Sequence, residues 1–538
     1  MKKGISASYG YAMGHIQVKR SEDISIISIK VEDAERERQK LNRAVKTSKY
    51  QLQEIKQRAQ KEFGNEKADL FESHIMLLED PEFIGSALRD IEENKVSAES
   101  AVKNVVDMYL NIFEAMQNGY IKERAVDIKD VGNRVLSNLA SKPYGNIKIN
   151  RSDTVLVAHD LTPSDTLEVD KSKVVAFLTD IGGNTSHTAI MARTMDIPAV
   201  VGLMDITSMV KDGDYVIVDG VDGAVIINPT EAELNDYKHR KAVFEEGRRK
   251  LRELKDVDAV TSSGKYINIS GNIARPEDVE KVIENGGAGI GLFRTEFLYM
   301  DRDNLPSEKE QLEAYKYVLE RMNNKPVVIR TLDIGGDKKL PYLDIEFEAN
   351  PFLGYRAIRI CLDRRDIFKV QLRALLRASV YGNIKILFPM ISTIQEFLEC
   401  KEVLNECKGE LIEENISFKE NIEIGIMVEV PSAAILADEF AKHVDFFSIG
   451  TNDLTQYTLA ADRMNSKISY MYDQMNPAVL RLIKMTIDAA HKERKICSMC
   501  GEMAGDAQVI PILIEYGIDG LSMNASAILN AKGAVLKL

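Results

Sequence analysis

The sequence predicts a multidomain α/β protein that ends in a (β/α)8 TIM barrel. Three observations support this prediction. Helical periodicity fills residues 31–140, strand-like runs lie on both sides of that helical block, and eight short apolar runs alternate with helical patterns after residue 259. A chain of 538 residues has room for two to four domains.

The chain begins with strand-like sequence at residues 4–20 and then changes to helix. Apolar side chains recur every three or four residues from residue 31 onward, which indicates one face of an amphipathic helix. The recurring positions are Leu41, Val45, Leu52, Ile55, Ala59 and Phe63. Further helices are expected at 66–79, 82–94, 97–118 and 120–140. Residues 21–144 are therefore predicted to form a helical subdomain, whose helical hairpins offer faces for docking a carrier protein.

Strand-like runs return after the helical block, at residues 154–158, 174–178, 215–218 and 224–227. Together with the first strands they predict one α/β domain built from residues 1–20 and 145–230. Residues 231–258 follow as a charged helical stretch with few apolar anchors. Such a stretch suits a helical linker between mobile parts, and a plain surface helix explains it equally well.

Residues 259–538 repeat a simple unit in which a short apolar run precedes a helical pattern. Eight such units fit a (β/α)8 barrel. The predicted strands are residues 266–269, 289–293, 327–329, 384–388, 424–428, 446–449, 496–499 and 520–523.

Composition narrows the possible partners and the cellular compartment. The formal charge is −13 and the sequence holds no basic block, which argues against nucleic acid and anionic membranes as partners. No apolar run is long enough to span a membrane and no signal peptide is recognisable, so a cytoplasmic location is expected. The five cysteines do not suggest a disulfide framework, and the lone C-x-x-C pair at Cys497 and Cys500 lacks the second pair that a zinc site needs.

A glycine-rich turn at residues 182–183 leads into a helix that begins near His187. Thr185 and Ser186 are good N-cap residues for this helix. The unpaired N–H groups and the dipole at a helix N-terminus favour an anion and disfavour imidazolium. A neutral imidazole next to a phosphate-binding position is therefore expected. That arrangement suits a histidine that accepts a phosphoryl group, although local spacing alone fits a capping or surface histidine as well.

Polar residues follow the predicted barrel strands, at the ends where such barrels carry their catalytic groups. Arginine forks bind phosphate and carboxylate in a bidentate manner, and two spaced carboxylates suit a hard divalent cation that also bridges substrate oxygens. These residues predict a site for a small, doubly anionic, metal-chelating ligand. They are Asn272, Arg294, Arg330, Asp333, Glu429, Asn452, Asp453, Cys500, Glu502 and Asn524, with Arg463 as a further candidate.

Several strings of residues resemble the phosphoenolpyruvate-utilising enzymes, and in particular the Enzyme I family of the phosphoenolpyruvate:sugar phosphotransferase system. The first half carries GGNTSHTAIMAR at residues 182–193, which resembles the family's phosphohistidine segment. The second half carries GIGLFRTE (289–296), RTLD (330–333), NPFLGYR (350–356), MVEVPS (427–432), SIGTNDLTQY (448–457) and CGEMAGD (500–506). The resemblance covers nearly the whole chain and includes motifs in both halves.

The resemblance implies a role for each matching residue. His187 would be phosphorylated in a swivelling domain and would pass the phosphoryl group to HPr, a small carrier docked on the helical subdomain. Cys500 would donate the proton that converts enolpyruvate into pyruvate, and Glu429 and Asp453 would hold Mg²⁺. The substrate-binding set implied by the resemblance is Arg294, Arg330, Arg356, Asn452, Asp453 and Arg463. The family also forms homodimers, and residues 74–80 resemble part of its docking region, although a helix core explains them too.

Three alternatives stay open on the sequence alone. The first is an ATP-coupled dikinase, disfavoured because no Walker motif and no large ATP-binding region precede His187. The second is a barrel lyase or aldolase acting on a pyruvate enolate, and the third is a non-catalytic regulator. The short C-terminus gives the third alternative some weight. Residues 527–538 leave room for one short helix, whereas the family usually continues through further helices. Barrel closure and the dimer interface are therefore in question.

Overall fold

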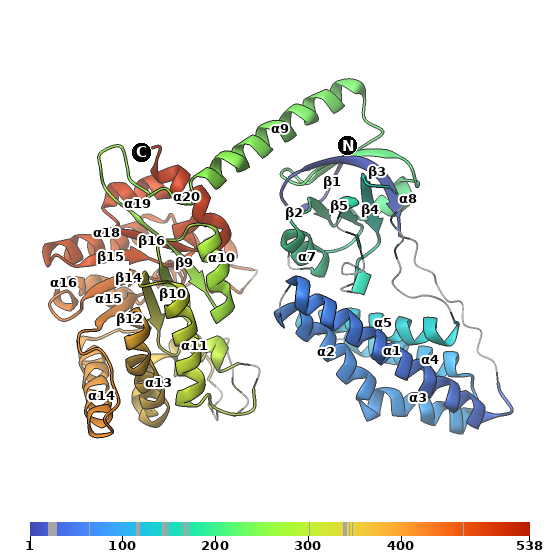
Figure 1. Cartoon of the computed structure of the whole chain (residues 1–538), viewed down its shortest axis with the longest axis horizontal. Coiled ribbons are helices and arrows are strands. Elements are labelled where there is room, and N and C mark those ends of the chain that lie inside the picture. The colour runs from blue at the N-terminus through green and yellow to red at the C-terminus, as the bar shows by residue number, and fades with distance from the viewer. Residues whose placement is uncertain are drawn as a thin grey trace. The chain divides into compact units, whose positions relative to one another are not determined.

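The computed structural model comprises two compact units, residues 1–246 and 247–538, which are described separately (Figure 1). The structure describes all residues except 20–29, 64, 115–118, 142–146, 148, 150, 163, 166–168, 171, 185, 301, 337–339, 341, 344, 347 and 466. The side chains of 59, 61–63, 65–70, 114 and 119–126 are also left undescribed. Among the helices described, none is long and apolar enough to cross a membrane.

An eight-stranded mixed sheet forms the α/β part of the first unit. Its order is β1-β8-β7-β3-β4-β5-β6-β2, in which β3, β4, β5 and β6 run parallel and the outer strands pair antiparallel. The strands β4 and β5 are buried throughout or nearly so, as expected for the centre of a sheet covered on both faces. The bounds are β1 Lys2–Lys3, β2 Ile5–Ser8, β3 Tyr11–Val18, β4 Thr154–Ala158, β5 Val174–Thr179, β6 Ala199–Val201, β7 Tyr215–Asp219 and β8 Ala224–Ile227.

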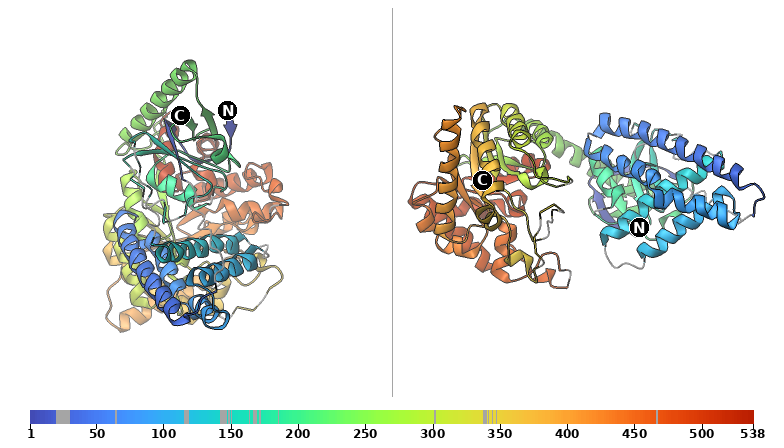
Figure 2. Two further views of the ribbon diagram at one scale, coloured as in Figure 1. Left: turned by 90° about the vertical axis from the view of Figure 1, so that its right-hand side faces the viewer. Right: turned by 90° about the horizontal axis from the view of Figure 1, so that it is seen from below.

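Five helices inserted between β3 and β4 form the helical subdomain (Figures 1 and 2). They are α1 Ala34–Phe63, α2 Asn65–Glu79, α3 Pro81–Asn94, α4 Ala98–Glu114 and α5 Gly119–Leu139. Predicted apolar positions such as Leu41 and Leu52 are fully buried in its core. Asp80 caps α3 by accepting from the Glu82 amide at 2.8 Å, and Pro81 occupies the first turn. The last predicted residues of the 97–118 helix, 115–118, lie outside the described residues.

The helix α9, Glu231–Glu253, follows the sheet and contains the boundary between the two units. Near its start, Tyr237 packs edge-on against Tyr11 of β3. Beyond its end, the buried Lys532 donates to the Lys255 carbonyl at 2.6 Å and to the Leu254 carbonyl at 3.3 Å. Each end of α9 is therefore anchored to a different unit.

The second unit is a closed barrel of eight parallel strands, as the sequence predicts. The strands are β9 Asn268–Ile273, β10 Ile290–Arg294, β11 Pro326–Arg330, β12 Asn383–Phe388, β13 Glu423–Val428, β14 Phe446–Ile449, β15 Ile496–Met499 and β16 Gly520–Met523. The outer helices include α10 Val279–Glu284, α11 Glu308–Arg321, α12 Ile358–Asp363, α13 Arg365–Ala378, α14 Ile394–Glu413, α18 Pro477–Lys492, α19 Ile510–Tyr516 and α20 Ile528–Val535. Short helices α15 Pro431–Ile435, α16 Ala437–Phe440 and α17 Thr451–Leu459 follow strands β13 and β14.

The barrel closes within the present sequence, because β16 pairs with β9 along four residues. The last helix, α20, packs Ala531 and Val535 into the barrel core. The question that the short C-terminus raised about closure is therefore answered, whereas the homodimer stays a prediction.

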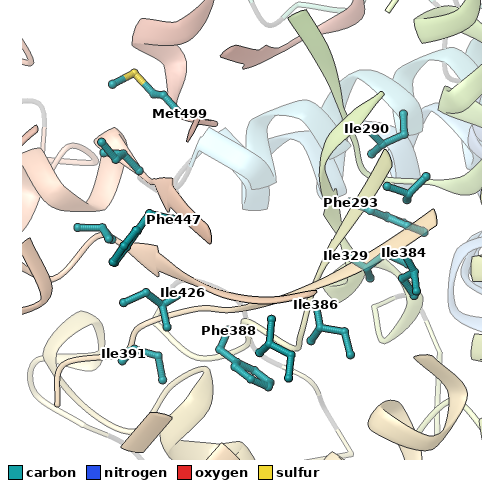
Figure 3. Close-up of a cluster of buried hydrophobic side chains, with 14 of the residues drawn as sticks. Ile290, Phe293, Ile329, Ile384, Ile386, Phe388, Ile391, Ile426, Phe447 and Met499 are labelled. Carbon is teal, nitrogen blue, oxygen red and sulfur yellow. The ribbon is translucent and has the colours of Figure 1, made fainter. Parts of the chain in front are cut away.

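The core of the barrel unit lies between the strands and the outer helices. Figure 3 shows Phe388 among neighbours that include Ile386 and Ile391. Its ring meets Phe368 of α13 and Phe397 of α14 edge-on, with centroids 6.0 and 6.3 Å apart. Alternate strand residues point the other way and form a small separate cluster of Leu292, Leu387, Met427, Phe446 and Cys500.

Truncation of Phe388 should destabilise the barrel strongly. Phe388→Ala removes a fully buried ring through which β12 packs against α13 and α14. We therefore expect the free energy of unfolding to fall by about 3–5 kcal/mol. Urea denaturation followed by circular dichroism measures it. Leu398→Ala, on the exposed face of α14, is the matched control and should change stability by less than about 1 kcal/mol. Equal losses in the two variants would contradict this account of the core.

Candidate functional site

His187 is the first residue of α7, His187–Met195, in the first unit. Ser186 is the N-cap, and its hydroxyl accepts from the Ala189 amide at 3.3 Å. Thr185, the other predicted cap, lies outside the described residues. Gly182 adopts φ +117°, a conformation that a side chain would strain, so the glycine permits the turn into α7. The structure thus places His187 at a capped helix N-terminus, as predicted.

The helix α7 is held rigidly while the imidazole of His187 remains half-buried. Ala189 and Ala192 pack under the sheet, and Met191 joins the core of the helical subdomain. The carboxyl of Asp160 lies near the ring. Burial raises the pKa of Asp160, and the hydrogen bond from the Leu161 amide acts in the opposite direction. The ring is therefore presented by a fixed backbone beside one acidic neighbour.

A cavity of about 520 Å³ opens at the carboxyl ends of the barrel strands. Every substrate, metal and proton-donor residue predicted for the barrel lines it. Its lining includes Asn272, Arg294, Arg330, Asp333, Arg356, Glu429, Asn452, Asp453, Arg463, Cys500, Glu502, Asp506 and Asn524. The sequence prediction of a convergent mouth is borne out geometrically, while the role of each residue stays a prediction.

Two of the arginines are held by buried carboxylates. Arg330 donates to Glu296 at 2.7 Å and lies 2.9 Å from Asp333. Arg356 donates to the other oxygen of Asp333 at 2.9 Å and lies 3.3 Å from Asp453. Asp333 therefore bridges both guanidinium groups, and these opposite charges keep the pKa of each arginine above its ordinary value although burial acts to lower it.

Glu429 and Asp453 meet at the same end of the cavity. Burial, and next the negative charges of Asp453 and Asp333, raise the pKa of Glu429 to about 8. The Met390 amide donates to Glu429 at 2.6 Å, whereas Oδ1 of Asp453 is buried without a hydrogen-bond partner among the residues that the structure describes. Two crowded carboxylates with a spare oxygen form a donor set that a divalent cation would satisfy. Among the described residues no group of three or more His, Cys, Asp or Glu side chains forms a metal cluster.

Cys500 lies at the base of the cavity with its thiol mostly buried. Ser448 donates to its sulfur at 3.3 Å, and the thiol contacts the Ile449 carbonyl at 3.7 Å. Burial raises the pKa of Cys500 to about 11, so the group is a protonated thiol at neutral pH. Cys497 instead belongs to the outer core, which separates it from Cys500 and leaves both cysteines free.

The remaining predicted binding residues surround this centre. Arg294 ends β10 and is paired in register with Arg330 of β11, and its side chain is exposed. Asn452 exchanges hydrogen bonds with Glu502, at 3.1 and 3.3 Å, which fixes its amide. The Arg463 backbone is tied to Gln456 at 3.2 Å. Both Arg294 and Arg463 line the cavity.

Two residues in the motif strings carry contacts that the sequence did not reveal. Glu296 orients Arg330, and Tyr457 accepts from Arg356 at 3.0 Å. Their side-chain directions depend on the tertiary fold, and only their place in the GIGLFRTE and SIGTNDLTQY strings could have singled them out. His74, in the predicted docking string, is buried beside Asp127 and Asp130. Its place favours the helix-core interpretation, whereas the neighbouring Met76 is exposed.

A capped helix bearing a histidine and a barrel mouth lined by arginines, carboxylates and a thiol define a protein class that handles small phosphorylated anions. Comparison with known families agrees. Residues 248–538 match the PEP-binding domain of the PEP-utilising enzymes, residues 3–124 match their N-terminal region, and residues 150–223 match their mobile domain. The chain belongs to the PEP-utilising enzyme family.

Individual relatives match along the whole chain. The phosphoenolpyruvate-protein phosphotransferase of Priestia megaterium is 50% identical over 536 residues, which cover 100% of this chain and 94% of that protein. The protein of the same name from Bacillus subtilis strain 168 is 49% identical over 536 residues, with the same coverage. A solved NMR structure of Enzyme I (nEIt) is 44% identical, covers 46% of this chain and 100% of its own, and has a TM-score of 0.40.

The raised pKa of Cys500 predicts how its reactivity depends on pH. Only the thiolate attacks iodoacetamide, so the alkylation rate at Cys500 should rise about tenfold per pH unit, or about 100-fold from pH 8 to pH 10. Peptide mass spectrometry follows the modification. Cys500→Ser should abolish it, because the other four cysteines are at most 1% exposed. A rate that levels off before pH 9 would contradict the buried, protonated state.

Proposed function

We propose that the protein is a phosphoenolpyruvate–protein phosphotransferase. It transfers the phosphoryl group of phosphoenolpyruvate to His187 and then to a histidine of the carrier protein HPr, and it releases pyruvate, as the first step of sugar uptake. The observation that carries this proposal is the cavity in which Arg294, Arg330 and Arg356 meet Glu429 and Asp453. Relatives with that activity in their names are about half identical over the full chain, which supports the same assignment.

The cavity offers complementary groups to each part of phosphoenolpyruvate. Four arginines, at positions 294, 330, 356 and 463, supply fixed positive charge for the phosphate and the carboxylate. Because Arg330 and Arg356 are already held by carboxylates, their forks need no reorganisation when the substrate binds. Asn452 adds a neutral amide to the substrate-binding set.

We assign Glu429 and Asp453 as the residues that hold Mg²⁺. The unpartnered oxygen of Asp453 and the Glu429 carboxyl, whose pKa is raised by burial and then by neighbouring carboxylates, fit a hard cation that offsets this negative charge and completes its shell with water and substrate oxygens. When bound, the cation would neutralise charge on the transferring phosphoryl group and on the enolate oxygen.

The reaction with phosphoenolpyruvate comprises a phosphoryl transfer to His187 and a proton transfer from Cys500. A nitrogen of the His187 ring attacks phosphorus, the N–P bond forms and the bond to the enol oxygen breaks, so the enolate of pyruvate departs. The Cys500 thiol then gives its proton to the methylene carbon of the enolate, and water returns a proton to the thiolate. The raised pKa of Cys500 suits a group that must arrive protonated.

The carrier would bind the helical subdomain, because that subdomain packs directly on the helix that presents His187. Met191 of α7 lies in its core, while Met76 of α2 and Met108 and Ile112 of α4 are exposed large apolar side chains. Exposed apolar side chains are a common component of docking surfaces. The swivelling of the α/β domain, the domain boundaries given above and the homodimer belong to the same proposal.

Labelled phosphoenolpyruvate with Mg²⁺ tests the proposed function directly. We expect an acid-labile, base-stable phosphoprotein whose label moves to added HPr, because phosphohistidine hydrolyses readily in acid. His187→Ala should reduce labelling at least 1,000-fold, since it removes the nucleophile. His15→Ala, in strand β3 of the same unit, is the matched control and should label normally. Labelling of His187→Ala at the normal rate would overturn the assignment.

The metal assignment predicts a selective loss of cation affinity. Glu429→Gln keeps the shape of the side chain and removes its charge, so the Mg²⁺ concentration for half-maximal labelling should rise at least tenfold. Chelation by EDTA should stop the reaction of the parent protein. Glu423→Gln, at the opposite end of the same strand, should leave the Mg²⁺ requirement unchanged. Equal requirements in the parent and Glu429→Gln would exclude Glu429 as a ligand.

A further inference from the structure

A buried amide outside the barrel connects the two strands that end in Arg294 and Arg330. Gln371 of α13 is 1% exposed. Its oxygen accepts from the Leu332 amide at 2.9 Å, and its nitrogen donates to the Thr295 hydroxyl at 3.0 Å. Thr295 directly follows Arg294, and Leu332 lies two residues beyond Arg330. The Gln371 side chain therefore hydrogen-bonds to the Leu332 backbone, just after β11, and to the Thr295 side chain, just after β10.

Thr295 completes a closed set of hydrogen bonds. Its hydroxyl, fully buried, donates to the Arg330 carbonyl at 2.8 Å. The same two strands show a register irregularity between Ile290 and Phe293, before Arg294 and Arg330 come into pair. Hydrogen bonds beyond the strand ends thus fix the spacing of two guanidinium groups at a point where the regular ladder is interrupted.

The polar network continues away from the cavity, which provides an internal comparison. The Gln371 nitrogen also donates to the Tyr315 hydroxyl at 3.2 Å, and that hydroxyl donates to Gln311 at 3.0 Å. Tyr315 is fully buried and contacts neither strand end through these bonds. The network therefore has one arm that reaches the ends of the arginine strands directly. The other arm runs through Tyr315 to Gln311 of α11, which also accepts from the Tyr299 hydroxyl at 3.1 Å.

We propose that Gln371 and Thr295 are positioning residues that set the separation of Arg294 and Arg330 for binding of phosphoenolpyruvate. A buried polar network is expensive to maintain unless every member is satisfied, and an apolar contact would serve simple packing between strand and helix as well. Satisfied amide and hydroxyl groups give direction as well as contact, and bidentate recognition of phosphate or carboxylate depends on direction. The proposal rests on the proposed function, because it assumes that the arginines bind this substrate.

The test measures phosphoenolpyruvate affinity in the presence of Mg²⁺ by isothermal titration calorimetry in the His187→Ala background, where the substrate is not consumed. Thr295→Val keeps the shape of the side chain and removes the hydroxyl, and Gln371→Met keeps length and removes the amide. We expect each to raise the dissociation constant about tenfold. Thr295→Ser restores the hydroxyl and should stay within twofold of the parent.

Tyr315→Phe is the matched control, because it breaks the arm of the network that does not reach the arginines. It should lower the melting temperature as Thr295→Val does and leave the dissociation constant within twofold. Equal weakening by Tyr315→Phe and Thr295→Val, or unchanged affinity in Thr295→Val, would overturn the proposal. If Gln371→Met does not fold, the Thr295→Val and Thr295→Ser pair decides.

The outcomes distinguish a failure of the proposed function from a failure of the positioning role. A His187→Ala protein that binds no phosphoenolpyruvate at all would count against the proposed function itself. If the His187→Ala protein binds phosphoenolpyruvate and Thr295→Val does not change its dissociation constant, the proposed function stands and the positioning role is excluded. In the catalytically intact chain, the same variants should raise KM for phosphoenolpyruvate by the same factor.

Discussion

The carboxylate of Asp333 is the contact on which the barrel mouth depends. It bridges Arg330 and Arg356, one on each oxygen, in a region almost closed to water. Removing one partner from such a cluster leaves an uncompensated buried charge, which is strongly destabilising. The arginines therefore keep a fixed direction before any ligand arrives, and the site recognises an anion with groups that are already oriented. The hydrogen bonds of Glu296, Tyr457 and Gln371 extend the same constraint outward.

The architecture was largely predictable from the sequence because it follows from local periodicity. The eight barrel strands are confirmed, three of them with the predicted ends and the others with ends that shift by at most four residues. The helical block between β3 and β4 is confirmed as five helices within the described residues. The convergence of polar residues at the mouth of the barrel was predictable for the same reason, since residues at the carboxyl ends of the barrel strands lie at one end of the barrel. The family and the enzyme class are confirmed by relatives that span both units. A barrel lyase would not account for the match of the first unit, so that alternative is excluded.

The contacts within the site were not predictable, because they depend on side-chain directions across distant segments. Asp333 was singled out as a strand-end residue, yet nothing in RTLD shows that it holds Arg356, 23 residues away. Gln371 is one polar position on an amphipathic helix in the sequence. Only the folded structure brings it against Thr295 after β10, Leu332 after β11 and Tyr315 of α11, where it makes three hydrogen bonds. Nor could the sequence decide between docking and packing within residues 74–80, where His74 is buried and Met76 is exposed.

The charges lining the cavity explain why arginines alone would not bind the substrate. Four arginines line it, and five carboxylates, those of Asp333, Glu429, Asp453, Glu502 and Asp506, line it too. Two of the arginines already neutralise carboxylates of the protein. A multiply charged anion would therefore meet a lining with no net positive charge, and Glu429 resists ionisation in this setting. A divalent cation held by Glu429 and Asp453, as proposed, would remove this conflict, because its charge would offset the acidic side of the cavity and attract the same anion.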